Sequence, residues 1–140
     1  MSSIKLNKSL LFFLCIIFVL FPFRGFLLNL GCNFKFKSDS NNVVNLGQCR
    51  AGLLSVYTWD KNSGGKYYNK FIMGTYSNTI YLVKVSGYAI KIPTNNETSD
   101  YIFNNVFFVG SLIKVNDRKY IVDIDYPDDS VMTFPVNIKK

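Results

Sequence analysis

Aromatic rings and positive charges gather in one part of this chain, in a pattern that suits ligand binding. Trp59 stands before a polar loop, and Lys66, Tyr67, Tyr68 and Lys70 follow that loop closely. Aromatic faces attract sugars and cations. The sequence therefore predicts a binding face for a sugar, a lipid or a peptide. The alternative explanation is that the rings pack in a core beside a solvated loop.

A serine and a lysine could together form a hydrolytic pair. The chain contains no histidine, which excludes Ser-His-Asp and Cys-His catalysis within it. Lys84 lies in the apolar run LVKV at 82–85, and Ser38 and Ser40 precede it. A lysine buried in such a run can lose its proton at neutral pH and act as a base. The alternative is that Lys84 lies on an exposed strand face.

The same residues resemble part of a known enzyme family. An apolar N-terminal segment followed by a small β domain with LVKV at 82–85 is similar to the signal-peptidase family. The resemblance implies a Ser nucleophile at Ser38 or Ser40 and a Lys general base at Lys84. The chain departs from the family at positions 86–88, where Ser-Gly-Tyr replaces the expected Gly-Asp pair. The Met or Pro of the family's serine motif is also absent after both serines.

The sequence predicts no metal site and no cofactor. Asp123, Asp125, Asp128 and Asp129 are close together, but their spacing is not that of an EF-hand. A solvated strand edge and turn explains them. Zinc is a poor fit to a chain with three cysteines, one of them in an apolar run, and no histidine.

Two of the three cysteines are candidates for a disulfide. Cys15 lies in an apolar run, whereas Cys32 and Cys49 lie in the polar part of the chain. In an oxidising compartment these two can pair, which would stabilise the fold by about 3 kcal/mol for a loop of that length. The alternatives are two free thiols, or a lipidated Cys32 with a buried Cys49.

The N-terminus predicts a signal peptide or a membrane anchor. Leu10 to Phe23 is an unbroken apolar run preceded by Lys5 and Lys8. Its fourteen residues would rise about 21 Å as a helix, but apolar character resumes up to Leu30, which is long enough to cross a bilayer. Residues 28–32 (LNLGC) look like a bacterial lipoprotein signal. A single-pass anchor, a cleaved signal peptide of a secreted protein, a lipoprotein and a buried core helix all stay open.

The charges around the apolar run predict its orientation. Lys5 and Lys8 favour an N-terminus on the cytoplasmic side, although Arg24, Lys35 and Lys37 on the far side weaken this bias. We expect the C-terminal domain to be extracytoplasmic. Three segments are expected: a leader or transmembrane helix at 1–31, a linker at 32–50, and a small β domain at 51–140.

Beyond position 50 the pattern is that of short antiparallel strands. Runs rich in Val, Ile, Tyr, Phe and Thr alternate with turn residues. We expect strands at 53–59, 67–76, 79–85, 88–92, 101–109, 112–115, 119–126 and 130–138. Ser86-Gly87 is expected to form a turn, and Pro135 suggests an edge strand. The fold class is therefore all-β, as a small antiparallel sandwich or barrel preceded by one hydrophobic helix.

These features predict binding rather than catalysis. After the leader, thirteen Lys or Arg residues stand against nine Asp or Glu, with no dense basic stripe, so nucleic acid is not expected as a partner. We expect an envelope protein that contacts a membrane through its N-terminal segment. We expect it to bind a protein partner through the loops at 60–70 and 93–100. The alternatives are a signal-peptidase-like enzyme and a structural accessory subunit of a membrane complex.

Overall fold

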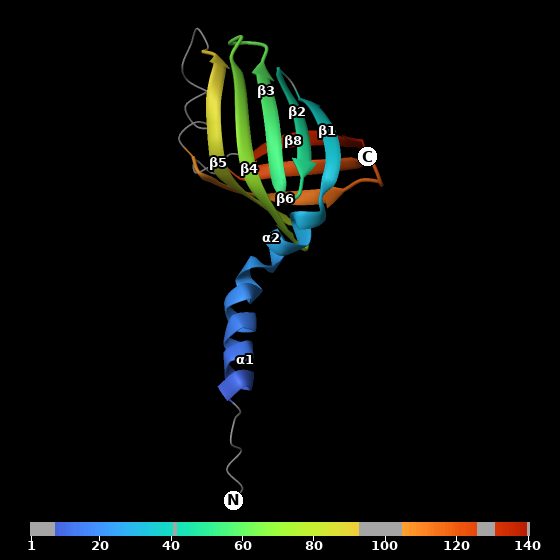
Figure 1. The fold of residues 1–140 in the computed structure, drawn as a ribbon. Helices are drawn as coiled ribbons and strands as arrows, with labels where there is room; N and C mark the ends of the chain where they lie inside the picture. The colour runs from blue at the N-terminus through green and yellow to red at the C-terminus, as the bar shows by residue number, and fades with distance from the viewer. Residues whose placement is uncertain (1–7, 41, 93–104, 126–130, 140) are drawn as a thin grey trace, which may run out of the picture.

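An apolar helical segment leads into a β barrel (Figure 1). The computed structural model describes residues 8–40, 42–92, 105–125 and 131–139. The segment consists of two α-helices, α1 (Lys8–Leu20) and α2 (Arg24–Leu28), and two short 3-10 helices, η1 (Phe21–Phe23) and η2 (Asn29–Gly31). The strands are β1 (Asn33–Ser40), β2 (Val43–Arg50), β3 (Leu53–Asp60), β4 (Lys66–Tyr76), β5 (Thr79–Lys91), β6 (Phe107–Lys114), β7 (Lys119–Asp125) and β8 (Val131–Lys139).

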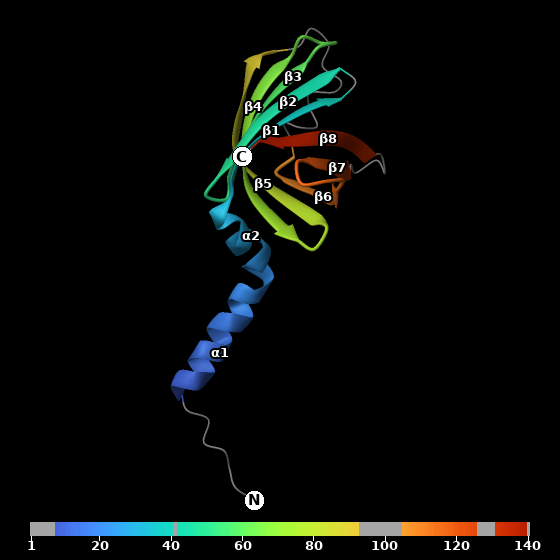
Figure 2. The same cartoon turned by 90° about the vertical axis from the view of Figure 1, so that its right-hand side faces the viewer.

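The sheet closes on itself in the simplest order. Each strand from β1 to β8 pairs antiparallel with the next, and β8 pairs with β1. The prediction of a small antiparallel β domain after one hydrophobic helix is confirmed, and the open choice between sandwich and barrel is decided for the barrel. Figure 2, turned by 90°, shows β6, β7 and β8 crossing the direction of the earlier strands, as the twist of a closed sheet requires.

The expected linker at 32–50 is wrong, because this segment forms β1 and β2. The two strands pair along their whole length, from Asn33 opposite Arg50 to Ser40 opposite Val43. Phe34 and Phe36 alternate with lysines, which is the period of two of a strand with one apolar face. The polar composition of the segment reflects the solvent-facing side of this hairpin, so the β domain begins near position 33.

The expected turn at Ser86-Gly87 is also wrong. β5 runs without interruption through these residues, and Gly87 lies opposite Asn69 of β4. The register shifts between Lys70 and Phe71, so a β-bulge bends the sheet where a chain reversal was expected. Gly87 therefore lies beside a β-bulge, at a point where the Asn69 side chain approaches the backbone closely.

The boundaries of β6 and the position of β8 differ from expectation as well. The strands expected at 101–109 and 112–115 are one strand, β6, and residues 101–104 lie outside the described part of the chain. β8 is no edge strand, since it pairs on both sides. Its ladder with β1 begins at Val136, so Pro135 lies just beyond the last pair and removes none of these hydrogen bonds.

The N-terminal helical segment lies outside the barrel. α1 has no buried residue, which excludes the alternative of a buried core helix. Lys8–Gly31 forms one helical segment that is long and apolar enough to cross a membrane. The 3-10 turn η1 contains Pro22, which lacks the backbone N–H of a regular helix. Figure 1 shows α1 pointing away from the barrel.

α2 is fixed to the end of the barrel where β4 turns into β5. The Asn29 side-chain amide donates to Thr75 Oγ1 at 2.7 Å and to the Gly25 carbonyl at 2.7 Å. The Arg24 guanidinium lies 3.9 Å from the centroid of the Tyr76 ring, a cation–π contact. Gly25 packs against the backbone of Thr75, where a Cβ would approach the Thr75 oxygen to 3.0 Å. The barrel is therefore held directly against the apolar segment.

A disulfide completes this junction. Cys32, at the start of β1, is bonded to Cys49 at the end of β2, as the sequence suggested. The Ala51 N–H donates to the Cys32 carbonyl at 3.0 Å, so the β2–β3 turn is tied to the same point. Covalent and hydrogen bonds thus hold the first strand where it leaves the helical segment.

Replacing Cys32 and Cys49 together by alanine should lower the free energy of unfolding by about 3 kcal/mol, because the bond closes a loop of this length in the unfolded chain. The measurement is guanidinium unfolding of the full chain in amphipol, followed by Trp59 fluorescence. Cys15→Ala, a change at an exposed residue of α1, is the control and should leave the midpoint unchanged. An unaltered midpoint in the double variant would contradict the prediction.

Candidate functional site: a cavity inside the barrel

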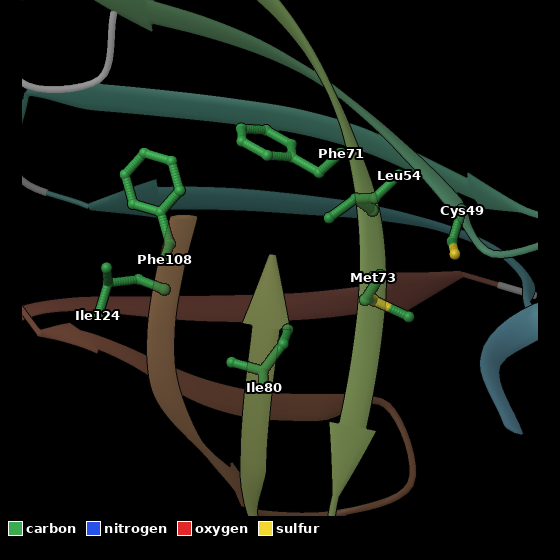
Figure 3. Packing of buried hydrophobic residues seen from close by; sticks show 7 residues of the cluster. All are labelled: Cys49, Leu54, Phe71, Met73, Ile80, Phe108 and Ile124. Atoms are coloured by element: carbon green, nitrogen blue, oxygen red, sulfur yellow. The ribbon is translucent and has the colours of Figure 1, made fainter. Parts of the chain in front are cut away.

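The inward side chains of the barrel form a core that does not fill its interior. Seven buried residues from the six strands β2 to β7 point inward (Figure 3). The rings of Phe71 on β4 and Phe108 on β6 meet edge to face, with centroids 5.8 Å apart. A cavity of about 810 Å³ is left between the strands. Eight-stranded barrels are close to the size at which side chains either fill the interior or leave room for one small ligand.

The walls of the cavity are mainly apolar. Every strand contributes at least one lining residue. The apolar lining side chains are Phe34, Phe36, Leu54, Val56, Phe71, Met73, Ile80, Leu82, Phe108, Leu112, Val122, Ile124, Phe134, Val136 and Ile138. Such a surface releases water readily to an apolar ligand.

A group of polar side chains lines the cavity deep inside the barrel. We call Ser38, Asn45, Thr58 and Asn69 the polar floor. Ser38 lies opposite Asn45 and Asn45 opposite Thr58, so the first three form a row across β1, β2 and β3. Thr58 Oγ1 donates to Asn45 Oδ1 at 2.7 Å. Ser38 and Asn69 are each 1% exposed, and within the described chain Ser38 Oγ and Asn69 Oδ1 have no hydrogen-bond partner.

Gly87 makes room for the polar floor. A Cβ at this position would collide with Asn69 Oδ1 and would lie 2.8 Å from Lys84 Cε. The Asn69 amide and the Lys84 stem therefore meet over the bare backbone of Gly87. Partial burial lowers the pKa of Lys84 below its ordinary value, because desolvation disfavours the charged ammonium.

The cavity opens at the end of the barrel to which the helical segment is attached. Among the described residues, the exposed ones that line it are Gly31, Asn33, Lys114 and Asp117, and all four lie at that end, beside the start of β1 or the β6–β7 turn. Lys114 Nζ and Asp117 Oδ1 form an ion pair at 2.8 Å, with side chains 58% and 93% exposed. The polar floor lies farther along the strands, with Ser38, Thr58 and Asn69 buried and Asn45 half-buried. A ligand would thus enter from the side of the apolar helix.

The structure does not bring together the serine and lysine considered for catalysis. Ser38 is on β1 and Lys84 on β5, which are four strands apart in either direction around the barrel. Ser38 Oγ has no hydrogen-bond partner in the described chain, so it does not bond to Lys84. Ser40 Oγ donates instead to the Thr133 carbonyl at 3.3 Å. A Ser-Lys pair would need these groups in contact.

Four of the five residues expected to form the aromatic and cationic face share the outer surface. Lys66 Nζ lies 5.6 Å from the centroid of the Trp59 ring, and Lys70 Nζ lies 5.9 Å from that of Tyr68. The fifth, Tyr67, is opposite the inward Thr58 and is only 4% exposed, so it faces the interior.

The outer face also includes two residues that were not expected there. Tyr57, Tyr68 and Tyr88 are successive register partners on β3, β4 and β5, and they form a row across the sheet. Tyr68 and Tyr88 have ring centroids 5.4 Å apart. We call Trp59, Lys66, Tyr68, Lys70, Tyr57 and Tyr88 the tyrosine face.

The loop between β3 and β4 is organised by one carboxylate. Asp60 Oδ1 accepts hydrogen bonds from the backbone N–H groups of Asn62 and Ser63, and Oδ2 accepts from Ser63 Oγ at 2.7 Å. Burial alone would raise the pKa of Asp60, but these hydrogen bonds outweigh it and lower the pKa below its ordinary value. The second expected contact loop, 93–100, lies outside the described residues, as do Asp128 and Asp129.

Sequence reasoning missed the polar floor although the signal was present. Ser38 was expected only as a possible nucleophile, and Asn69 was not among the expected site residues. Both fall on the apolar face of an alternating strand, after Phe36 in one case and before Phe71 in the other. A polar residue at an inward position of such a pattern is the feature to look for.

The chain matches no family model, no curated protein and no solved structure.

Replacing Asp60 by alanine should destabilise the protein at neutral pH by roughly 1 kcal/mol, the size of a comparable capping interaction. Because the folded pKa lies below the ordinary value of 3.8, the contribution is complete above that pH and is lost as the pH falls through the folded pKa. The difference in urea midpoint between wild type and variant should shrink in acid.

Asp125→Ala, at an exposed carboxylate of β7, serves as the control for this series and should show a smaller loss at neutral pH. A difference between wild type and Asp60→Ala that stays constant from pH 7 to pH 3 would show that the loop does not depend on the charge of Asp60.

Proposed function

We propose that this protein is a membrane-tethered binding protein that holds one apolar small molecule inside its barrel. The cavity is the observation that supports this most strongly. Its volume of about 810 Å³ falls in the range of roughly 300–1,000 Å³ that ligand pockets occupy. A mainly apolar wall with a few polar groups at one place is the usual composition of such pockets.

The position of the opening supports a ligand that comes from a membrane. α2 is docked at the end of the barrel where the exposed lining residues lie, and α1 leads away from it. A bilayer that contained α1 would lie on the side of this opening. An apolar molecule could then pass between membrane and cavity over a short path. A short path matters because exposure of an apolar molecule to water is unfavourable.

Two features of the chain support a proposal for the location of the barrel. Lys5 and Lys8 favour a cytoplasmic N-terminus. The bond between Cys32 and Cys49 is typical of proteins in oxidising compartments outside the cytoplasm. We therefore propose a signal-anchor orientation, with the barrel on the extracytoplasmic side.

Filling the cavity should abolish ligand binding. Leu82 lines the cavity from β5, so Leu82→Trp would place a large ring in the space that the ligand needs. We expect at least a tenfold weaker affinity for the neutral fluorescent probe N-phenyl-1-naphthylamine, measured by titration of the full chain in amphipol.

The matched control is Ile72→Trp, which adds the same ring on the outer side of neighbouring β4, where Ile72 is 40% exposed. This variant should bind the probe as wild type does. Equal binding by wild type and Leu82→Trp would mean that the probe lies in the amphipol or on the outer surface, and the proposed function would fail.

A second candidate function is recognition of a protein partner by the tyrosine face. Trp59 is 40% exposed and lies beside Lys66, and Tyr88 is 57% exposed and lies beside Tyr68, whose ring Lys70 approaches. Aromatic residues, Tyr and Trp among them, are enriched where proteins bind one another. We propose this face as the contact surface for a partner in the envelope, compatible with an occupied cavity because it lies on the other side of the sheet.

Reversing the charge of Lys66 and Lys70 to glutamate should reduce cross-linking of the full chain to such a partner about tenfold in membranes of cells that express it, since two cation–π contacts of the face would be lost. Lys119→Glu, an exposed charge on β7, is the control. A cross-linking pattern that is the same in all three proteins would contradict a role for the tyrosine face.

A further inference from the structure

Two polar atoms of the polar floor are placed for a ligand. Ser38 Oγ and Asn69 Oδ1 are buried, line the cavity, and have no hydrogen-bond partner in the described chain. Buried polar atoms without a partner are few in folded proteins, because each one loses its hydrogen bond to water. Their neighbours Asn45 and Thr58 are bonded to each other. Within the polar floor, the unmet hydrogen-bonding capacity is therefore concentrated at these two atoms.

We propose that the polar floor recognises the hydroxyl group of an uncharged, single-tailed amphiphile, which enters the barrel with its hydroxyl end first. This inference rests on the proposed ligand-binding function and names the chemical class of its ligand. The tail would lie along the apolar wall, toward the opening beside Lys114 and Asp117.

The chemistry of the two atoms selects a hydroxyl. Asn69 Oδ1 is an acceptor and needs a donor, while the hydroxyl of Ser38 can donate or accept. A ligand hydroxyl also does both, so it can satisfy either atom. A carboxylate only accepts, so it would leave Asn69 Oδ1 unmet and would bury a charge. An ammonium group would donate, but it would approach the cationic side chain of Lys84, whose stem meets Asn69 over Gly87.

The choice between a hydroxyl and a carboxylate at the polar end of the ligand depends on Lys84. The charge of Lys84 would attract a carboxylate, but a carboxylate has no proton to donate to Asn69 Oδ1. The arrangement of the deepest groups favours the hydroxyl, because Ser38 and Asn69 line the cavity and Lys84 does not.

The test is displacement of N-phenyl-1-naphthylamine from the full chain in amphipol by three compounds with unbranched tails of nearly equal length: 1-dodecanol, dodecyl methyl ether and dodecanoate. We expect 1-dodecanol to displace the probe at about tenfold lower concentration than the other two, the effect of one net hydrogen bond. In Asn69→Leu, a change of similar volume, this advantage should disappear while the probe still binds. The unfolding temperature should rise, since a buried orphan atom is removed.

Ser38→Ala provides a second variant that keeps the test valid if Asn69→Leu does not fold, and it should reduce the advantage of 1-dodecanol severalfold. Three outcomes would overturn the inference while leaving the proposed function intact: equal displacement by all three compounds, tightest displacement by dodecanoate, or an unchanged preference in both variants. The last would show that ordered water, and not the ligand, satisfies the two atoms. Absence of probe binding in wild type would instead overturn the proposed function itself.

Discussion

The pairing of β8 with β1 is the constraint on which the rest of this structure depends. Four register pairs, from Lys35 with Lys139 to Ser38 with Val136, join the first and last strands. They convert a curved sheet into a barrel with no edge at that seam. Only a closed sheet has an inside and an outside, so the cavity, the polar floor and the tyrosine face all exist because these two strands meet.

Closure also explains why polar residues remain in the interior. In a closed barrel every second side chain of each strand faces the interior, whether it is apolar or polar. Glycines occupy positions where inward groups would otherwise collide: Phe36 lies over Gly47, and the Asn69 amide lies over Gly87. The Asn69 side chain thus lies against Gly87 of β5 and also lines the cavity.

The junction with the helical segment gives the barrel a direction. α2 contacts the end of β4, Cys32 is bonded to Cys49, and the opening of the cavity lies at this same end. An apolar helix, a rigid connection and an apolar cavity that opens toward the helix form one continuous arrangement. Tethering would matter to such a protein because it sets the distance between membrane and cavity.

Several elements could be predicted from the sequence because their signals are local. The apolar helix, the strands β3, β4 and β7, and the outward position of Asp125 follow from composition and from the period of two. β1 was missed because its outward residues are charged, and β5 was divided in two because a bulge beside Gly87 looks like a turn. Four of the five residues expected on one face lie together on the outer surface, whereas the alternation turns Tyr67 inward, and their role in binding stays a prediction.

The sequence by itself determined that this chain has an apolar N-terminal segment, a body of antiparallel strands and no histidine chemistry. These properties depend on residue type and on neighbours within a few positions, where hydrophobicity and strand period act. Only the tertiary structure decided that Ser38 and Asn69 share a cavity, and that Ser38 and Lys84 do not meet. The pairing of strands distant in the chain sets which side chains face each other across a barrel, and no local pattern contains that information.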